Sequence, residues 1–250
     1  MAKIVVANWK MNPQSQKEVE FLLSKMQTEA KNVKNTQIVI CPPFPFLYLF
    51  KKLKSKKIFL GSQNISSGIE GPYTGEVSPK MLKNLGVQYF IVGHSERRAL
   101  GESDKIINEK VLNLLKFKFT PIICIGEATR DKDGFYLSYI GEQIKDCLSG
   151  VSKSQIKNVI IAYEPIWAIG ANATREATKE EFIEIKIFIK KIISDIYHAK
   201  VAHNIPIIYG GSVNPQNAQP FIKEGEADGL LIGRDSLNPK KFGAILSAIN

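Results

Sequence analysis

The chain has 250 residues, 44% of them hydrophobic and 23% charged, which argues against a disordered or fibrous protein and is ordinary for a globular one. Its 34 Lys and Arg against 24 Asp and Glu give a net charge of +10, which favours anionic ligands in a general way. The densest basic run, residues 51–57, lacks the interleaved aromatic side chains of a base-stacking surface. We therefore expect a solvated basic face and no nucleic-acid partner.

Eight short runs rich in β-branched residues recur about every 30 residues, the length of a strand plus a crossover helix. They are apolar nearly throughout, which is typical of parallel strands covered by helices on both faces. Together they predict an α/β fold, a closed (β/α)8 or TIM barrel; a doubly wound open sheet is the structural rival, but no G-x-G-x-x-G follows the first run. Because no linker-like stretch divides the chain, we expect a single domain over residues 1–250. The runs cover residues 3–9, 37–41, 58–63, 88–93, 121–125, 158–163, 205–209 and 229–232.

The segments between these runs carry helix-start signals. Pro13 after Asn12 predicts that the first helix begins there, since proline suits a first helical position. Thr178 and Glu181 form a capping box ahead of a helix predicted over residues 182–200. Isoleucine alternates within this last segment as it does in strands, but the length of the segment and its cap favour a helix.

In such a barrel, reactive side chains come from the carboxyl ends of the strands. The sixth run delivers Glu164, and a carboxylate against an apolar strand is costly unless something pairs with it. Pro165 keeps Glu164 extended, and small residues after Trp167 suit a hinge. Taken alone, the segment is equally compatible with a solvated Glu at a strand end beside a packed Trp.

A lysine and a histidine follow the first and fourth runs. Lys10 ends an apolar run, although in a lysine-rich chain a solvated side chain is the ordinary alternative. His94 precedes a predicted helix with Ser95 as its cap, where the helix dipole and free N–H groups disfavour an imidazolium. A core histidine with a satisfied hydrogen bond is the alternative. To His198 and His203 we assign no chemistry.

Glycine-containing turns follow the seventh and eighth runs. Gly210 and Gly211 lead into Ser212, and Gly233 leads into Arg234. Such turns expose backbone N–H groups, which suits a phosphate. Each turn alone is weak evidence, but the last two strands of a barrel commonly hold phosphate.

Four segments resemble, in family order and over essentially the whole chain, the signature segments of the triosephosphate isomerase family. They read NWKMN from Asn8, GHSERR from Gly93, YEPIWAIG from Tyr163 and YGGS from Tyr209. The resemblance implies interconversion of dihydroxyacetone phosphate and D-glyceraldehyde 3-phosphate through an enediolate, a step of glycolysis and gluconeogenesis. It calls for no metal and no organic cofactor.

The resemblance also implies roles for individual residues. Glu164 is the base that takes a proton from carbon, His94 is the electrophile, and Lys10 is the cation that holds substrate and offsets enediolate charge. The remaining implied residues are polar supports or supply main-chain N–H groups to the phosphate: Asn8 beside the substrate, Ser95 and Glu96 as supports, and Gly170, Ser212, Gly233 and Arg234 around the phosphate.

The resemblance also implies a lid over the site, formed by Pro165, Ile166, Trp167, Ala168, Ile169 and Gly170. The chain departs from the family pattern in two places. After the lid come residues 171–175, ANATR, where the family usually has a Gly-Lys-Thr-like hinge; Asn172 tolerates a left-handed backbone, so closure should survive. Arg234 stands where the family usually has a second glycine. Because arginine does not adopt positive φ cheaply, we expect negative φ there, with the side chain turned to solvent.

Residues 64–75 form a long polar loop, of a length that often marks a binding loop. In the family this loop docks into a second subunit beside its active site. We therefore expect a homodimer, with Thr74 near Lys10 of the neighbouring subunit. A surface loop without a partner is the alternative.

Cysteine usage and apolar runs bear on location. The three cysteines show no C-x-x-C spacing, so we expect buried thiols in a reducing compartment. No apolar run approaches a membrane span or a signal-peptide core. The expected location is cytoplasmic, away from membranes.

Two rival functions remain at this point. A different barrel enzyme acting on a phosphorylated sugar, such as an aldolase or epimerase, would share the phosphate turns; a Schiff-base aldolase would need a desolvated Lys10. A non-catalytic barrel scaffold would show broken chemistry at the strand ends, yet all four key positions are filled.

Overall fold

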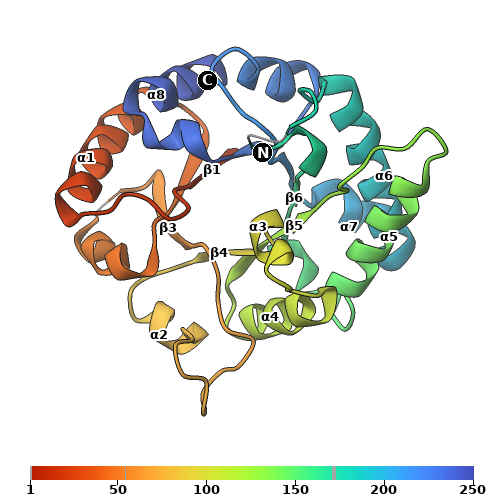
Figure 1. The fold of residues 1–250 in the computed structure, drawn as a ribbon, viewed down its shortest axis with the longest axis horizontal. Coiled ribbons are helices and arrows are strands. Elements are labelled where there is room, and N and C mark those ends of the chain that lie inside the picture. The colour runs from red at the N-terminus through yellow and green to blue at the C-terminus, as the bar shows by residue number, and fades with distance from the viewer. Residues whose placement is uncertain (1, 54, 171–172) are drawn as a thin grey trace.

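The computed structural model describes residues 2–53, 55–170 and 173–250, and its parallel strands close into one barrel in sequence order (Figure 1). Register between the first and last strands, with Ile4 opposite Gly229, completes the closure. The predicted (β/α)8 barrel is confirmed, and the ends of the strands differ from the predicted runs by at most two residues. The strands are β1 (Lys3–Asn8), β2 (Thr36–Cys41), β3 (Ile58–Ser62), β4 (Tyr89–Val92), β5 (Thr120–Ile125), β6 (Ile160–Tyr163), β7 (Ile207–Tyr209) and β8 (Gly229–Ile232).

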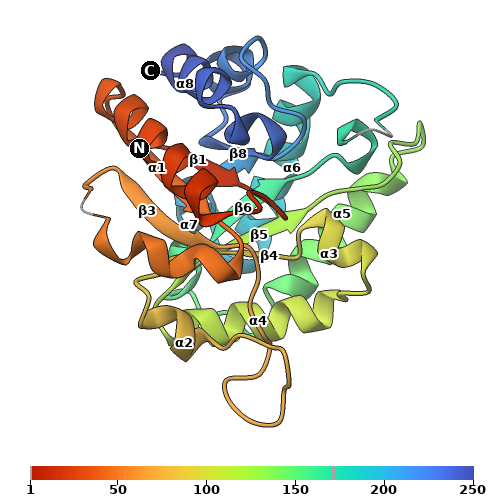
Figure 2. The ribbon, with the colours of Figure 1, turned by 60° about the vertical axis from the view of Figure 1, so that its left-hand side comes forward.

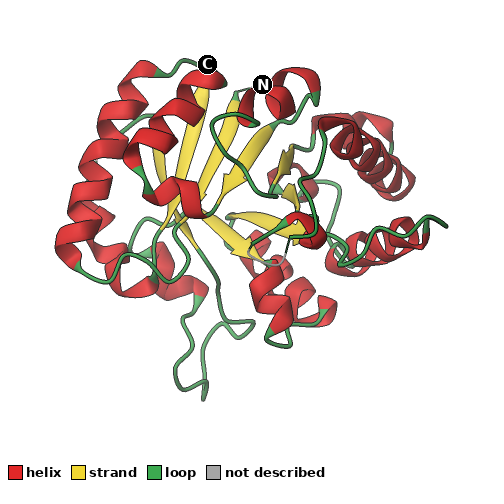
Figure 3. Cartoon of the chain, turned by 45° about the horizontal axis from the view of Figure 1, so that its top comes forward, coloured by secondary structure: helices red, strands yellow, loops and turns green. Residues whose placement is uncertain are grey.

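Helices surround this barrel, as Figure 3 shows by colour. The α-helices are α1 (Gln16–Asn32), α2 (Pro79–Lys83), α3 (Ser95–Ala99), α4 (Asp104–Lys116), α5 (Phe135–Cys147), α6 (Lys179–Tyr197), α7 (Ala199–Asn204) and α8 (Pro239–Ala248). The 3-10 or π-helical segments are η1 (Phe44–Lys52), η2 (Ile156–Asn158), η3 (Ile166–Ala168), η4 (Pro220–Glu224) and η5 (Arg234–Leu237).

Two predicted helix starts are wrong. Pro13 does not begin α1; Ser15 caps that helix, because its side chain accepts the N–H of Glu18. At α3 the cap is His94 rather than Ser95, since the histidine ring accepts the N–H of Glu96. In both cases the helix begins after the residue whose side chain accepts a free N–H group of the first turn, and not where it was predicted from sequence.

The capping box at Thr178 and Glu181 is confirmed, with both reciprocal hydrogen bonds present. The helix it starts is shorter at its C-terminal end than predicted. α6 ends at Tyr197, because His198 adopts a φ of +83°, and α7 follows.

The core has two layers, one inside the barrel and one between strands and helices. Alternation along β1 places Val6 in the interior and Val5 against the helices, and both are fully buried. This double burial is why the strands are apolar nearly throughout. At the first residue of β8, Gly229, an added Cβ would lie 1.9 Å from the carbonyl oxygen of Ile4, so the pairing of β8 with β1 requires glycine there. The free thiols are buried, as predicted: Cys41, Cys124 and Cys147.

The connection between β3 and α2 extends away from the body of the barrel (Figure 2). It contains the long polar loop predicted from sequence. None of the helices within the described ranges is long and apolar enough to cross a membrane.

Candidate active site

A cavity of about 410 Å³ opens at the carboxyl ends of the strands. Residues that follow β1, β4, β6, β7 and β8 line it, so segments far apart in the chain meet there because the barrel is parallel and closed. The lining includes most of the residues predicted from sequence: Asn8, Lys10, His94, Glu164, Gly170, Ser212, Gly233 and Arg234.

Glu164 is buried at the end of β6, with 2% of its surface exposed. Its carboxylate Oε2 accepts the N–H of Ser95 at 2.8 Å. Its Oε1 lies 3.2 Å from Nε2 of His94 and makes no hydrogen bond within the described part of the chain. The backbone of Gly126 packs closely against that of Glu164. Only glycine fits there, since a Cβ on residue 126 would lie 1.8 Å from the carbonyl oxygen of Glu164. One carboxylate oxygen is therefore held and the other is left for a ligand.

His94 is also buried, and its ring has a defined orientation. Nδ1 accepts the N–H of Glu96 at 3.2 Å, so this nitrogen carries no proton. In a neutral ring the proton then resides on Nε2, which faces Glu164. A ring held in this way can donate one hydrogen bond to a substrate oxygen.

Lys10 has a φ of +53°, which is uncommon outside glycine and turns its side chain from the end of β1 toward the cavity. Its N–H donates to Oδ1 of Asn8 at 3.0 Å, and its ammonium Nζ lies 2.6 Å from Oε1 of Glu96. Gln63 stabilises the turn, because its amide donates to the carbonyl oxygens of Lys10 and Cys41 at 2.8 Å each. Gln63 ends the third predicted run, a position that sequence analysis left without a role.

Three backbone N–H groups lie free beside the cavity. Within the residues that the structure describes, the amides of Gly170, Ser212 and Gly233 donate to no protein acceptor. The hydroxyl of Ser212 donates to the carbonyl oxygen of Ala168 at 2.7 Å, which ties the turn after β7 to the segment expected to form the lid. Unpaired N–H groups converging on one volume are suited to a dianionic phosphate.

Arg234 has the conformation predicted from sequence. Its φ is not positive, and its side chain is 94% exposed. The next residue, Asp235, is buried, and its Oδ1 lies 3.1 Å from Nζ of Lys241. Sequence analysis missed this pair. The lysine offsets a carboxylate that would otherwise oppose an anion in the cavity.

The sequence model of the family described as triosephosphate isomerase matches residues 3–249. The triosephosphate isomerase of Dictyoglomus turgidum is 42% identical over 247 residues, covering 98% of both chains. That of Aquifex aeolicus is 41% identical over 249 residues, covering 98% of this chain and 99% of its own. That of Borrelia garinii subsp. bavariensis is 42% identical over 250 residues, with 98% of both chains covered.

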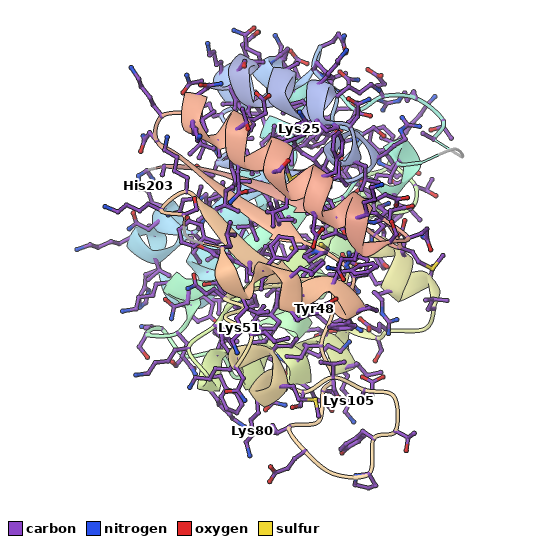
Figure 4. All side chains as sticks on the ribbon, turned by 90° about the vertical axis from the view of Figure 1, so that its left-hand side faces the viewer. Lys25, Tyr48, Lys51, Lys80, Lys105 and His203 are labelled. Atoms are coloured by element: carbon purple, nitrogen blue, oxygen red, sulfur yellow. The ribbon has the colours of Figure 1, made fainter. Side chains whose placement is uncertain are left out.

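The chain belongs to the triosephosphate isomerase family. Because the family match extends over nearly the whole chain, it does not favour either rival function, a different barrel enzyme acting on a phosphorylated sugar or a non-catalytic scaffold. In the described ranges, no group of three or more His, Cys, Asp or Glu residues could hold a metal ion. His203, labelled in Figure 4, lies on α7 and is not among the cavity residues.

In this member of the triosephosphate isomerase family, the segment expected to form the lid is held by a buried carboxylate that sequence analysis missed. Oε1 of Glu127 accepts the indole N–H of Trp167 and the hydroxyl of Tyr163, each at 2.8 Å. Burial raises the pKa of Glu127, and these hydrogen bonds oppose the rise. A signal was present, because Glu127 comes two residues after Ile125, where a strand-like run ends. Residues 171–172, part of the predicted hinge, lie outside the described residues.

Proposed function

We propose that Glu164, His94 and Lys10 carry out the isomerisation of dihydroxyacetone phosphate and D-glyceraldehyde 3-phosphate that this enzyme catalyses as a family member. One observation supports the assignment above the others. The buried carboxylate of Glu164 lies 3.2 Å from Nε2 of His94, in a cavity that Lys10 also lines. A base, a hydrogen-bond donor and a cation therefore face one volume.

The chemistry follows from these groups. A proton on a carbon beside a carbonyl is weakly acidic, so the negative charge that develops on oxygen must be stabilised. Glu164 takes this proton, while Nε2–H of His94 donates to the oxygens and Lys10 offsets the charge of the enediolate. Glu164, now protonated, returns the proton to the neighbouring carbon, and the double bond moves with it. The net change is one hydrogen moved between adjacent carbons and its counterpart between the two oxygens.

The phosphate half of the substrate binds to the N–H groups of Gly170, Ser212, Gly233 and Arg234. Residues 165–170 act as a lid that excludes water, which strengthens Glu164 as a base. Exclusion of water and a fixed phosphate also keep the enediolate from losing phosphate. The hydrogen bond from Ser212 to Ala168 supports this proposal, because it links the phosphate turn with the lid.

A coupled isomerase assay on wild type, Glu164→Gln and His94→Gln tests the assignment. Loss of a general base or acid commonly costs about 10²–10⁴-fold, so we expect kcat to fall by that range in both variants. Glu142→Gln, on α5 outside the cavity, is the matched control and should keep wild-type rates. Wild-type kcat in Glu164→Gln would refute the role of this residue.

We also propose that two copies of the chain form a homodimer through the loop of residues 64–75, with Thr74 near Lys10 of the neighbouring subunit. The projection of this loop supports the proposal (Figure 2). So does the exposure of apolar side chains on the loop and near Lys10, since Tyr73 is 52% exposed and Met11 83% exposed. Sedimentation of wild type and Thr74→Glu tests it. We expect a dimer that the substitution weakens; an active wild-type monomer at assay concentration would refute it.

The proposal includes two further expectations. The whole chain acts as one domain, which the continuous barrel from β1 to β8 supports. Its location is cytoplasmic, in keeping with a role in glycolysis and gluconeogenesis and with three free, buried thiols. Limited proteolysis tests the first expectation and should release no stable fragment.

A further inference from the structure

Arg175, which follows the lid segment, makes two contacts at once. Its guanidinium lies 4.3 Å from the centre of the Trp167 ring, in cation–π geometry. It also binds both carboxylate oxygens of Glu181, with Nη1–Oε2 at 2.9 Å and Nη2–Oε1 at 2.5 Å. Glu181 belongs to the capping box that starts α6, so the guanidinium joins the lid to a helix of the barrel wall.

Trp167 is held on its other sides as well. Its indole N–H donates to the buried Glu127, and its carbonyl oxygen accepts from the N–H and the hydroxyl of Thr174, at 2.8 and 3.1 Å. These contacts fix the edge and the backbone of Trp167, and Arg175 covers the ring face. Trp167 is buried among these contacts, with 7% of its surface exposed.

We propose that Arg175 is a positioning residue that stabilises the present lid conformation by stacking on Trp167 while anchored to Glu181. The inference rests on the proposed lid function of residues 165–170. The anchor lies on α6, which packs against the barrel, so the stack cannot follow the lid when it moves over the cavity. Arg175 itself lines the cavity, so its release also changes the side chains around the phosphate turns.

Such a contact shifts the lid equilibrium by an amount set by its strength. Arg175 is half exposed, so its ion pair with Glu181 contributes little by itself, and the stack on Trp167 carries the effect. An exposed cation–π contact corresponds to about a 2- to 5-fold change in an equilibrium constant. The stack opposes movement of the lid over the cavity. A ligand that binds only when the lid has moved over it should therefore bind about 2- to 5-fold more tightly once the stack is removed.

The test uses Trp167 as its own reporter. The chain has two tryptophans, so a Trp9→Phe background leaves Trp167 as the only one. In this background, indole emission and affinity for 2-phosphoglycolate, whose carboxylate resembles the enediolate, are measured for Arg175, Arg175→Ala and Arg175→Lys. We expect Arg175→Ala to change the emission of Trp167, to bind the analogue about 2- to 5-fold more tightly and to lower KM by a similar factor.

Arg175→Lys keeps the charge but loses the flat stack and the two-pronged pairing, so its shift should have the same direction and a smaller size. Lys179→Ala is the matched control. Lys179 lies on α6, as Glu181 does, but it pairs with Glu224 in η4 and not with Trp167, so its removal should change neither readout. Unchanged emission with unchanged or weaker analogue binding in Arg175→Ala would overturn the proposal. Absence of isomerase activity in wild type would instead refute the proposed function, because the emission readout does not depend on turnover.

Discussion

Gly210 is the position where one added methyl group should act on the proposed base and little else. The residue follows β7, and its N–H donates to the carbonyl oxygen of Tyr163 at 2.8 Å. In Gly210→Ala, the new Cβ would lie 3.0 Å from Cγ of Glu164 and 3.3 Å from that carbonyl oxygen. This distance is shorter than a van der Waals contact between carbon atoms, so the side chain of Glu164 has to move.

The size of the effect follows from the contact distance. Carbon atoms pack at about 3.5–4.0 Å, so relief from 3.0 Å moves Cγ of Glu164 by about 0.5 Å. A misplacement of about 1 Å at a reacting group can cost about 100-fold, which predicts about a 10-fold lower kcat for half that distance. Overpacking of this kind also costs about 1–3 kcal/mol of stability. Gly210 lies in the turn before Ser212, but the nearest atoms to the new Cβ belong to Glu164, Tyr163 and Leu231, so KM should change much less than kcat.

Gly141→Ala provides the matched control. It adds the same methyl group within α5, where the new Cβ would meet Cζ of Phe188 at an ordinary 3.5 Å. Because glycine is unfavourable in a helix interior, this variant should gain about 0.5–1 kcal/mol and melt about 2–4 °C higher per kcal/mol, with wild-type kcat. Steady-state kinetics in both directions and thermal unfolding measure these quantities. A Gly210→Ala enzyme with wild-type kcat would refute the reasoning, whatever its stability.

Three further predictions concern charge, protonation and reactivity. Arg234→Ala should change the inhibition constant of inorganic phosphate by less than about 3-fold, because an exposed charge contributes little; a collapse that Arg234→Lys rescues would show that the side chain binds the anion. ¹⁵N NMR at neutral pH should show His94 protonated on Nε2 and not on Nδ1, since Nδ1 accepts the N–H of Glu96, and the opposite tautomer would contradict the assignment. Burial raises the pKa of the thiols of Cys41, Cys124 and Cys147, that of Cys147 to about 12, so the reactive thiolate is scarce at pH 8. A thiol reagent should therefore label these cysteines only after unfolding, and labelling of the native protein would disprove this.

The barrel and the positions of the main site residues were predictable from sequence for a physical reason. A strand covered on both faces must be apolar at successive positions, and Val5 and Val6 show this, each fully buried on opposite sides of β1. Once eight such strands close in parallel, their carboxyl ends share one mouth. Glu164 and His94 therefore had to face the same volume, although 70 residues separate them in the chain.

The contacts that orient these groups were not predictable, because they depend on register and on the tilt of neighbouring strands. Nothing local to Glu127 shows that Tyr163 and Trp167 donate to the same oxygen of its carboxylate. The exchange of caps at His94 and Ser95 has the same origin, since the N–H of Ser95 is drawn to Glu164 from another strand.

Burial and periodicity act along one strand at a time, so the order of amino acids is enough to specify which residues of this protein reach the mouth of the barrel. The contacts that each of them makes depend on the packing of the complete barrel. The turn at Lys10, with its positive φ, is held by the hydrogen bond from Gln63 to the Lys10 carbonyl oxygen. The stack of Arg175 on Trp167 likewise joins residues that are not adjacent in the chain. Such contacts form when the whole barrel has packed, because angstrom-scale distances between distant segments are set by the sum of all the packing between them.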